Sequence, residues 1–233
     1  MRISGTYQDL RIILIRLLLT ESGDRNESAA RSLSVSSGDS THPEDTLQTF
    51  KSPNGVFQFK YPSVLVRCTQ SQRQEGWWIP DDDCNSQGEV CNDRETSAVV
   101  LTCLAYPKDE FKDKPEFSAA AFFVAEVRTA ATGESCLKGS RYWLVEKTED
   151  TTIHSVRMKR FTIGNAWTGG HLIGQIYRVF RGGACYEFGF RWASSDPSNI
   201  DPYTIKINQF TKQDADKVSS ALKQPVDSFI FLK

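Results

Sequence analysis

The most constraining feature of the sequence is a β-hairpin signal between Gln175 and Trp192. The runs QIYRVF and ACYEFGFRW flank Gly182 and Gly183, which adopt the positive φ of a tight turn without a side-chain clash. One face of the second run carries four aromatic residues: Tyr186, Phe188, Phe190 and Trp192. The other face carries Cys185, Glu187, Gly189 and Arg191. Because aromatic residues dominate core burial, the pattern favours packing of a sheet against a core over an exposed ligand platform.

Other strands are predicted by alternation and by β-branched composition. In the segment 56–61, aromatic and other residues alternate with a period of two, which predicts a half-buried strand that Pro62 ends. Residues 64–68 are the predicted hairpin partner of that strand. The almost continuously apolar segment 97–106 predicts a central strand that is covered on both faces. Residues 118–128 are also predicted as a strand, although their alanines favour helix.

The C-terminal part of the chain predicts a helix. Thr211 is a good N-cap with Asp214 three residues later, and three apolar residues recur at helical spacing: Ala215, Val218 and Leu222. Pro225 is expected to stop this helix, and the apolar residues after it are expected to return to the core. A short helix that ends at Gly139 is also expected. Strands therefore dominate, which predicts an α+β fold with a mostly antiparallel sheet rather than a doubly wound parallel one.

Residues 1–49 are predicted to be a poorly ordered tail, and residues 50–233 a single domain with a polar insert at 70–95. The segment 20–48 is rich in Ser, Asp, Glu and Gly, and it has too few large apolar residues to offset the entropy of ordering. Residues 10–19 are apolar but interrupted by Arg11 and Arg16. This segment is either a degenerate export signal, a short amphipathic helix, or sequence translated from a misplaced start codon. No stretch is long and apolar enough to predict a transmembrane helix.

The cysteines favour an oxidising compartment. There are six, and none belongs to a C-x-x-C pair: Cys68, Cys84, Cys91, Cys103, Cys136 and Cys185. Three disulfides in a secreted or periplasmic protein is the favoured interpretation, and buried free thiols in a cytoplasmic protein is the alternative. The spacing of Cys84 and Cys91 suits a small disulfide-closed loop.

The insert is the predicted contact surface. Trp77 and Trp78 are adjacent and precede an acidic run. Because consecutive residues of an extended chain point in opposite directions, we expect the fold to bury at most one of the two indoles, which leaves the other for a protein or carbohydrate partner. The alternative is that both pack over a sheet edge. Three oxygen-bearing residues form a weak calcium candidate: Asp81, Asp83 and Asn85. The residues that follow these three do not match the EF-hand template, so a solvated acidic loop is the favoured interpretation.

Catalytic templates are not met. The sequence contains no G-x-S-x-G elbow, no phosphate-binding P-loop, no H-E-x-x-H helix and no dinucleotide fingerprint, so no catalytic residue and no cofactor is predicted. His154 and His171 could converge across a hairpin to bind a metal, but isolated histidines are the favoured interpretation. The net charge of −1 and a single basic cluster at 157–160 do not predict nucleic-acid binding.

Three segments resemble the PsbP-like superfamily, particularly its uncharacterised exported bacterial members. They are FKSPNGVFQFKYP at 50–62, LAYPKDEFKDKP at 104–115 and VDSFIF at 226–231. The resemblance implies an α-β-α sandwich around a central antiparallel sheet. Its members include an accessory subunit of photosystem II and a nuclear import factor that binds a small GTPase, and both act by binding. We therefore expect a non-catalytic exported or envelope-associated binding or accessory domain, with an enzyme of unrecognised class, a hydrolase in the first place, as the alternative.

Overall fold

The structure is a computed structural model that describes residues 46–68, 70–74, 77–80, 98–138, 144–167, 170–195 and 209–232. Within these ranges the side chains at 70–74, 77–80, 144, 165 and 167 are not described. Every strand pair in the described ranges is antiparallel. The predicted α+β class with a mostly antiparallel sheet is thereby confirmed.

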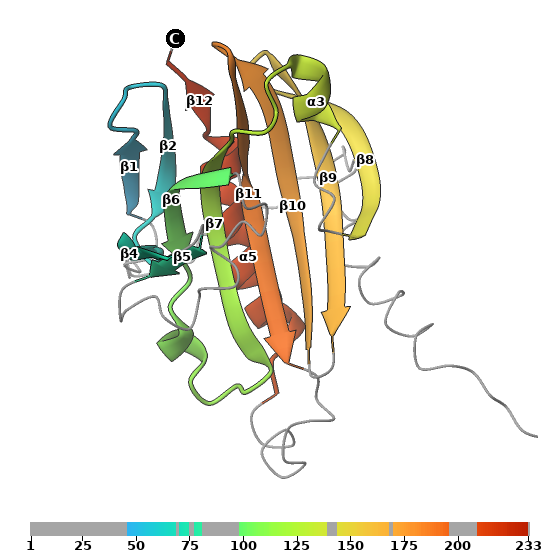
Figure 1. Ribbon diagram of the computed structural model, residues 1–233. Coiled ribbons are helices and arrows are strands. Elements are labelled where there is room, and N and C mark those ends of the chain that lie inside the picture. The colour runs from blue at the N-terminus through green and yellow to red at the C-terminus, as the bar shows by residue number, and fades with distance from the viewer. Residues whose placement is uncertain are drawn as a thin grey trace, which may run out of the picture. The chain divides into compact units, whose positions relative to one another are not determined.

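The main sheet has seven strands, in the order β3-β6-β7-β11-β10-β9-β8 (Figure 1). Their bounds are β3 Val66–Cys68, β6 Ala98–Ala105, β7 Phe117–Val127, β8 Leu144–Ile153, β9 Val156–Trp167, β10 Gly170–Arg181 and β11 Ala184–Ser195. The predicted strands at 97–106 and 118–128 correspond to β6 and β7. The alanines of β7 suit a strand because β6 and β11 pair with its two edges and almost all of its side chains are buried.

The predicted hairpin is β10 and β11. Arg181 pairs with Ala184, and the two turn glycines between them have φ values of +59° and +81°. The aromatic stripe of β11 lies in the core as predicted: Tyr186 and Phe188 are buried, and Phe190 and Trp192 are partly buried against the same cluster. The stripe is therefore structural.

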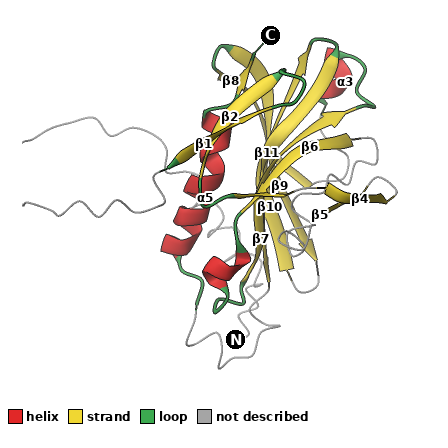
Figure 2. Cartoon of the chain, turned by 90° about the vertical axis from the view of Figure 1, so that its left-hand side faces the viewer, coloured by secondary structure: helices red, strands yellow, loops and turns green. Residues whose placement is uncertain are grey.

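A smaller sheet and the long helix cover the aromatic face of the main sheet. The smaller sheet has the order β1-β2-β12, with β1 at Leu47–Lys51, β2 at Phe57–Pro62 and β12 at Ile230–Phe231. Helix α5, Lys212–Asp227, packs against β2, β7 and β11 (Figure 2). The first described strand thus begins at Leu47, ahead of the predicted domain start at residue 50.

The predicted pairing of residues 64–68 with the strand that ends at Pro62 is wrong. The amide of Leu65 donates to the Pro62 carbonyl at 3.0 Å, which closes a tight turn. The chain then leaves the small sheet, and β3 pairs with β6, which places Cys68 opposite Cys103. The partners of β2 are β1 and β12 instead, and Phe50 of β1 is buried in the same core cluster as Phe57 and Phe59 of β2.

Helix α5 begins as predicted and ends later than predicted. Thr211 and Asp214 form a reciprocal capping box, and Ala215, Val218 and Leu222 are buried. Pro225 does not stop the helix, which continues to Asp227. A proline in the last turn removes only one hydrogen bond of the helix, and its buried ring contributes to packing. The residues after it return to the core through Phe229 and β12, as expected.

The opposite face of the main sheet carries a second core and the short helix α3, Gly133–Leu137. A disulfide with a sulfur–sulfur distance of 2.03 Å joins Cys136 in α3 to Cys185 in β11. Cys68 and Cys103 are also disulfide-bonded, so none of the four described cysteines is a free thiol. Within the described ranges no helix is long and apolar enough to cross a membrane.

Candidate functional site: a groove beside helix α5

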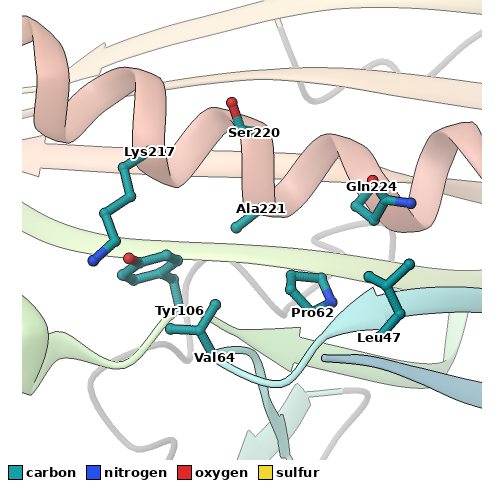
Figure 3. Close-up of a pocket in the computed structure, with 8 residues that line it drawn as sticks. All are labelled: Leu47, Pro62, Val64, Tyr106, Lys217, Ser220, Ala221 and Gln224. Carbon is teal, nitrogen blue, oxygen red and sulfur yellow. The ribbon is translucent and has the colours of Figure 1, made fainter. Parts of the chain in front are cut away.

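An open groove of about 390 Å³ lies between α5 and the segment that follows β2 (Figure 3). Eight residues from four segments of the chain line it: Leu47, Pro62, Val64, Tyr106, Lys217, Ser220, Ala221 and Gln224. Its volume is within the range of small-ligand pockets, and because it is open to solvent it also suits a segment of a larger molecule.

One wall of the groove is apolar and formed by backbone-paired residues. Leu47 pairs with Pro62 across β1 and β2, and the amide of Ser63 donates to the Thr46 carbonyl at 3.0 Å. These bonds hold Leu47 and Val64 beside the helix, and the side chain of Leu47 remains exposed, at 47%. An exposed leucine on a fixed strand is a contact that a partner can bury.

The other wall is a polar stripe of α5. Lys217, Ser220 and Gln224 follow one another at helical spacing and line the groove. In Figure 3 the Lys217 side chain extends toward Tyr106. The adjacent stripe of the helix holds Val218 and Leu222, which are fully buried. Because those two residues anchor the helix, the polar stripe has a fixed position opposite the apolar wall.

Tyr106 forms the floor between the two walls. Its amide donates to the Ala120 carbonyl at 2.8 Å, and its ring stacks on Phe111 with 5.6 Å between centroids. The residue is fully buried, and Figure 3 shows its hydroxyl directed toward the end of the Lys217 side chain. The floor is therefore aromatic, and it is fixed by the core.

Lys217 is the charged residue among the eight that line the groove. Its Nζ lies 3.6 Å from a carboxylate oxygen of Glu110, and the two side chains are 39% and 44% exposed. A long ion pair with this exposure contributes little to stability, because water screens it. This end of the groove therefore carries an exposed pair of opposite charges, Lys217 and Glu110.

The sequence-predicted contact residues are only partly described. Trp77 and Trp78 occupy consecutive positions of β5, Trp77–Pro80, which pairs with β4, Gln70–Gln74. The expectation that the two indoles point in opposite directions depends on an extended backbone, which β5 has. The side chains of Trp77 and Trp78 are outside the described part. The calcium candidates Asp81, Asp83 and Asn85, and the cysteines Cys84 and Cys91, also lie outside the described residues.

The two strand histidines do not converge. His154 is in the turn between β8 and β9, and its Nε2 lies 2.9 Å from the carbonyl oxygen of Asp227. His171 pairs with Ala166 near the opposite end of β9. Among the described residues no group of three His, Cys, Asp or Glu side chains could hold a metal ion.

His171 and Ser194 are neighbours without the geometry of a nucleophile and its base. The Ser194 Oγ lies 2.8 Å from Nε2 and 3.2 Å from Nδ1 of the same ring. Both nitrogens of one imidazole can approach one oxygen this closely only when the oxygen stands over the ring face. A general base instead accepts the proton in the plane of its ring, with the second nitrogen held by another group.

The predicted basic cluster at 157–160 is paired with acidic residues of the neighbouring strand. The Lys159 ammonium lies 2.9 Å from Asp150, and Nε of Arg160 lies 3.0 Å from Glu149. Hydrogen bonds from Lys147 and then Arg160 hold the pKa of the Glu149 carboxyl below its usual value, and Lys159 does the same to the pKa of Asp150. These contacts place Lys159 and Arg160 of β9 opposite carboxylates of β8.

Sequence reasoning missed the groove and one buried ionic cluster. The groove residues come from separate segments, and Leu47 falls in the predicted tail. The signal that was available is the pair Ser220 and Ala221, small residues beside the buried stripe of α5.

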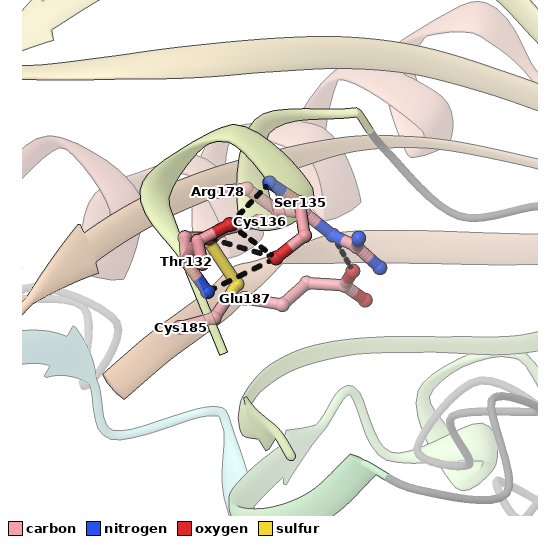
Figure 4. The surroundings of a disulfide bond; sticks show 6 residues. All are labelled: Thr132, Ser135, Cys136, Arg178, Cys185 and Glu187. Carbon is pink, nitrogen blue, oxygen red and sulfur yellow. Dashed lines mark hydrogen bonds and ion pairs between the residues drawn. A yellow bond between two sulfur atoms is a disulfide. The ribbon is translucent and has the colours of Figure 1, made fainter. Parts of the chain in front are cut away.

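The ionic cluster joins Glu187 to Arg178 and Arg191. Figure 4 shows Arg178 and Glu187 close to the Cys136–Cys185 disulfide. Alternation placed Glu187 and Arg191 on one face of the strand, but it did not reveal that this face is covered.

No protein-family model and no curated protein matches this chain. Similar solved structures include a mutant of the protein Mog1, with a TM-score of 0.42, 8% identity, and coverage of 81% of this chain and 97% of that one. The Ran-binding protein Mog1p of Saccharomyces cerevisiae has a TM-score of 0.39 at 9% identity, with coverages of 81% and 96%. Cyanobacterial PsbP (CyanoP) from Synechocystis sp. PCC 6803 has a TM-score of 0.37 at 11% identity, with coverages of 84% and 98%. A likeness of this size does not transfer function.

Proposed function

We propose that this chain is a non-catalytic binding domain that docks a partner protein in the groove beside α5. The observation that carries the proposal is the pairing of an apolar wall at Leu47 and Val64 with a polar helix wall that ends in Lys217. Such a surface combines apolar area with a few placed polar groups, which is how binding sites obtain affinity and orientation.

We also propose that the domain is exported or associated with the cell envelope. The disulfide between Cys136 and Cys185, together with the bonded state of Cys68 and Cys103, supports an oxidising compartment. We expect the full chain from its native host to take up almost no alkylating groups before reduction, and one group on each of its six cysteines after it. Complete alkylation without prior reduction would contradict export.

The α-β-α sandwich implied by the PsbP-like resemblance is part of the same proposal. Val218 and Leu222 of α5 belong to the core cluster that contains Phe188 of β11. Cys136 of α3 is bonded to Cys185 of β11 and belongs with it to the other cluster. Two helices on opposite faces of one sheet support that layer order.

The insert at 70–95 is proposed as a second contact surface, through Trp77 or Trp78, for a protein or a carbohydrate. We expect its ligand to quench tryptophan fluorescence, and the quenching to vanish in Trp77→Ala or Trp78→Ala. Quenching that survives both substitutions would exclude the insert as the contact.

Photo-crosslinking in the native host tests the groove. A photoreactive residue at position 220, inside the groove, is expected to capture one host protein. The same residue at position 223, exposed on α5 but not lining the groove, is the matched control and should not capture it. Because Leu47 is exposed, Leu47→Glu should leave the fold intact and abolish the adduct. An adduct that forms equally at both positions, survives Leu47→Glu, or never forms at position 220 would overturn the proposal.

A further inference from the structure

We infer that two copies of this chain associate through strand β1, with the outer edges of the two strands paired antiparallel and Thr49 of one copy opposite Thr49 of the other. This inference goes beyond the proposed function and is tested at Thr49, which does not line the groove. Figure 1 shows β1 as the outermost strand of the small sheet, with β2 between it and β12. In the described part of the chain, no strand pairs with the outer edge of β1.

Alternate residues of β1 direct their peptide groups toward that outer edge. At one end of the β1–β2 pair the Thr46 carbonyl accepts from the Ser63 amide at 3.0 Å, and at the other end the Ser52 amide donates to the Phe57 carbonyl at 2.9 Å. The even-numbered residues therefore bond to the neighbouring strand, because bonded and non-bonded pairs alternate along an antiparallel ladder. The remaining residues point their N–H and C=O groups away from β2: Leu47, Thr49 and Lys51.

Strand β1 lacks the features that protect the other outer strands of the two packed sheets. Strand β8 carries four charged residues and a bulge between Val145 and Lys147. Strands β3 and β12 contain only three and two residues. Strand β1 has five residues in unbroken register, and its single charge is Lys51 at the end. Short strands, charges and bulges block edge-to-edge pairing, so β1 is the edge of these two sheets that is suited to accept another strand.

The residues of β1 are complementary to a second copy of the same strand. A two-fold axis at Thr49 places Leu47 opposite Lys51 of the other copy, so all three outward-directed residues of each strand enter bonded pairs. A register shifted by two residues in either direction would bond only two of the three. Two threonines directly opposite each other are a favourable cross-strand pair, and the aliphatic stem of Lys51 can cover the exposed Leu47 side chain.

Charge repulsion does not oppose this register. The two copies of Lys51 are offset by four positions, which corresponds to about 13 Å along the strands. This distance exceeds the screening length of about 8 Å at physiological ionic strength. Because one strand pair buries less surface than a standard interface, we expect a dimer with a dissociation constant in the micromolar range.

Opposite charges at the axis test the inference. Sedimentation velocity of the full chain should show a reversible equilibrium between monomer and dimer. Thr49→Glu and Thr49→Lys each place like charges directly opposite each other and should weaken the dimer at least about tenfold. An equimolar mixture of the two variants should recover a heterodimer, because Glu then lies opposite Lys. The control is Gln58→Glu, which adds an acidic residue one strand away from the axis and should leave the association unchanged.

The recovery in the mixture also shows that the two variants are folded. A full chain that remains monomeric up to about 1 mM would overturn the inference. So would a dimer that tolerates Thr49→Glu, or a mixture of the two variants that stays monomeric. A photoreactive residue at position 49 should capture a second copy of the chain in the native host, and capture of a different protein there would overturn the inference as well.

Discussion

The carboxylate of Glu187 lies 2.6 Å from Nε of Arg178, and the two residues pair directly across the β10–β11 hairpin. The second carboxylate oxygen lies 3.3 Å from Nη2 of Arg191, whose guanidinium stands 3.9 Å above the ring of Phe123. All three ionic side chains are at most 2% exposed. A carboxylate that bonds two buried arginines fixes the register of β10 against β11, because a shift of one residue would separate the charges.

Replacing Glu187 by Gln should destabilise the protein strongly. The substitution preserves the shape of the side chain but leaves two buried guanidinium groups without this counter-charge. Removing one partner of a buried ion pair typically costs about 3–5 kcal/mol. Urea unfolding followed by tryptophan fluorescence measures the loss. Glu134→Gln breaks an exposed pair with Lys138 and should leave the unfolding midpoint unchanged. Equal effects of the two substitutions would contradict a structural role for the buried cluster.

The disulfide between Cys136 and Cys185 should supply a large share of the stability of α3 and the sheet. The two cysteines are 49 residues apart. Closing a loop of that length lowers the conformational entropy of the unfolded chain and so raises its free energy by about 4 kcal/mol. The double variant Cys136→Ala with Cys185→Ala should lose a comparable amount in urea unfolding. Urea unfolding of this double variant in the presence of reductant then measures the contribution of the remaining cysteines alone. A double variant as stable as wild type would show that the crosslink contributes nothing to folding.

Local patterns predicted those elements whose signal lies within one segment. The β10–β11 hairpin and the start of α5 followed from turn glycines, alternation and a capping box. The pairing of β2 did not follow in this way, because sequence spacing favours the nearest segment as the partner. Strand β12 is distant from β2 in the sequence, and β1 begins before the predicted domain start. The end of α5 was missed because the rule that proline stops a helix applies to its interior more than to its last turn.

The candidate site was largely invisible to the same reasoning. Leu47, Tyr106 and Lys217 line one groove although they come from β1, from the residue after β6 and from α5. None of the three belongs to a motif, and each has an ordinary structural interpretation in isolation. The burial of Glu187 depends in the same way on what covers its face of the sheet, which periodicity does not specify.

Gly189 should tolerate no side chain. Its φ is +155°, and a Cβ atom there would lie 2.1 Å from the Gln175 carbonyl oxygen on β10. Gly189→Ala must therefore push the backbones of β10 and β11 apart, at a cost of about 3 kcal/mol. Gly55→Ala is the control, because Gly55 has φ +67° and open space around the added atom, so only backbone strain of about 1 kcal/mol applies. Thermal unfolding should rank the two variants in that order, and the reverse order would refute the close approach.

Because of Asp214, the stability of α5 should decrease as the pH falls into the acidic range. Burial alone would raise the pKa of this carboxyl, but hydrogen bonds from Lys114 and Thr211 outweigh burial and hold the pKa below its ordinary value of 3.8. A pKa that is lower in the folded state gives stabilisation that is complete above the unfolded pKa. That stabilisation is lost as the pH falls below 3.8 toward the folded pKa.

Urea unfolding at about pH 6 should therefore show Asp214→Asn to be less stable than wild type, with a difference that shrinks near pH 3. Asp216→Asn changes an exposed carboxyl on the same helix and serves as the control. A difference between Asp214→Asn and wild type that stays constant over this pH range would mean that the ionised carboxylate does not provide the stabilisation.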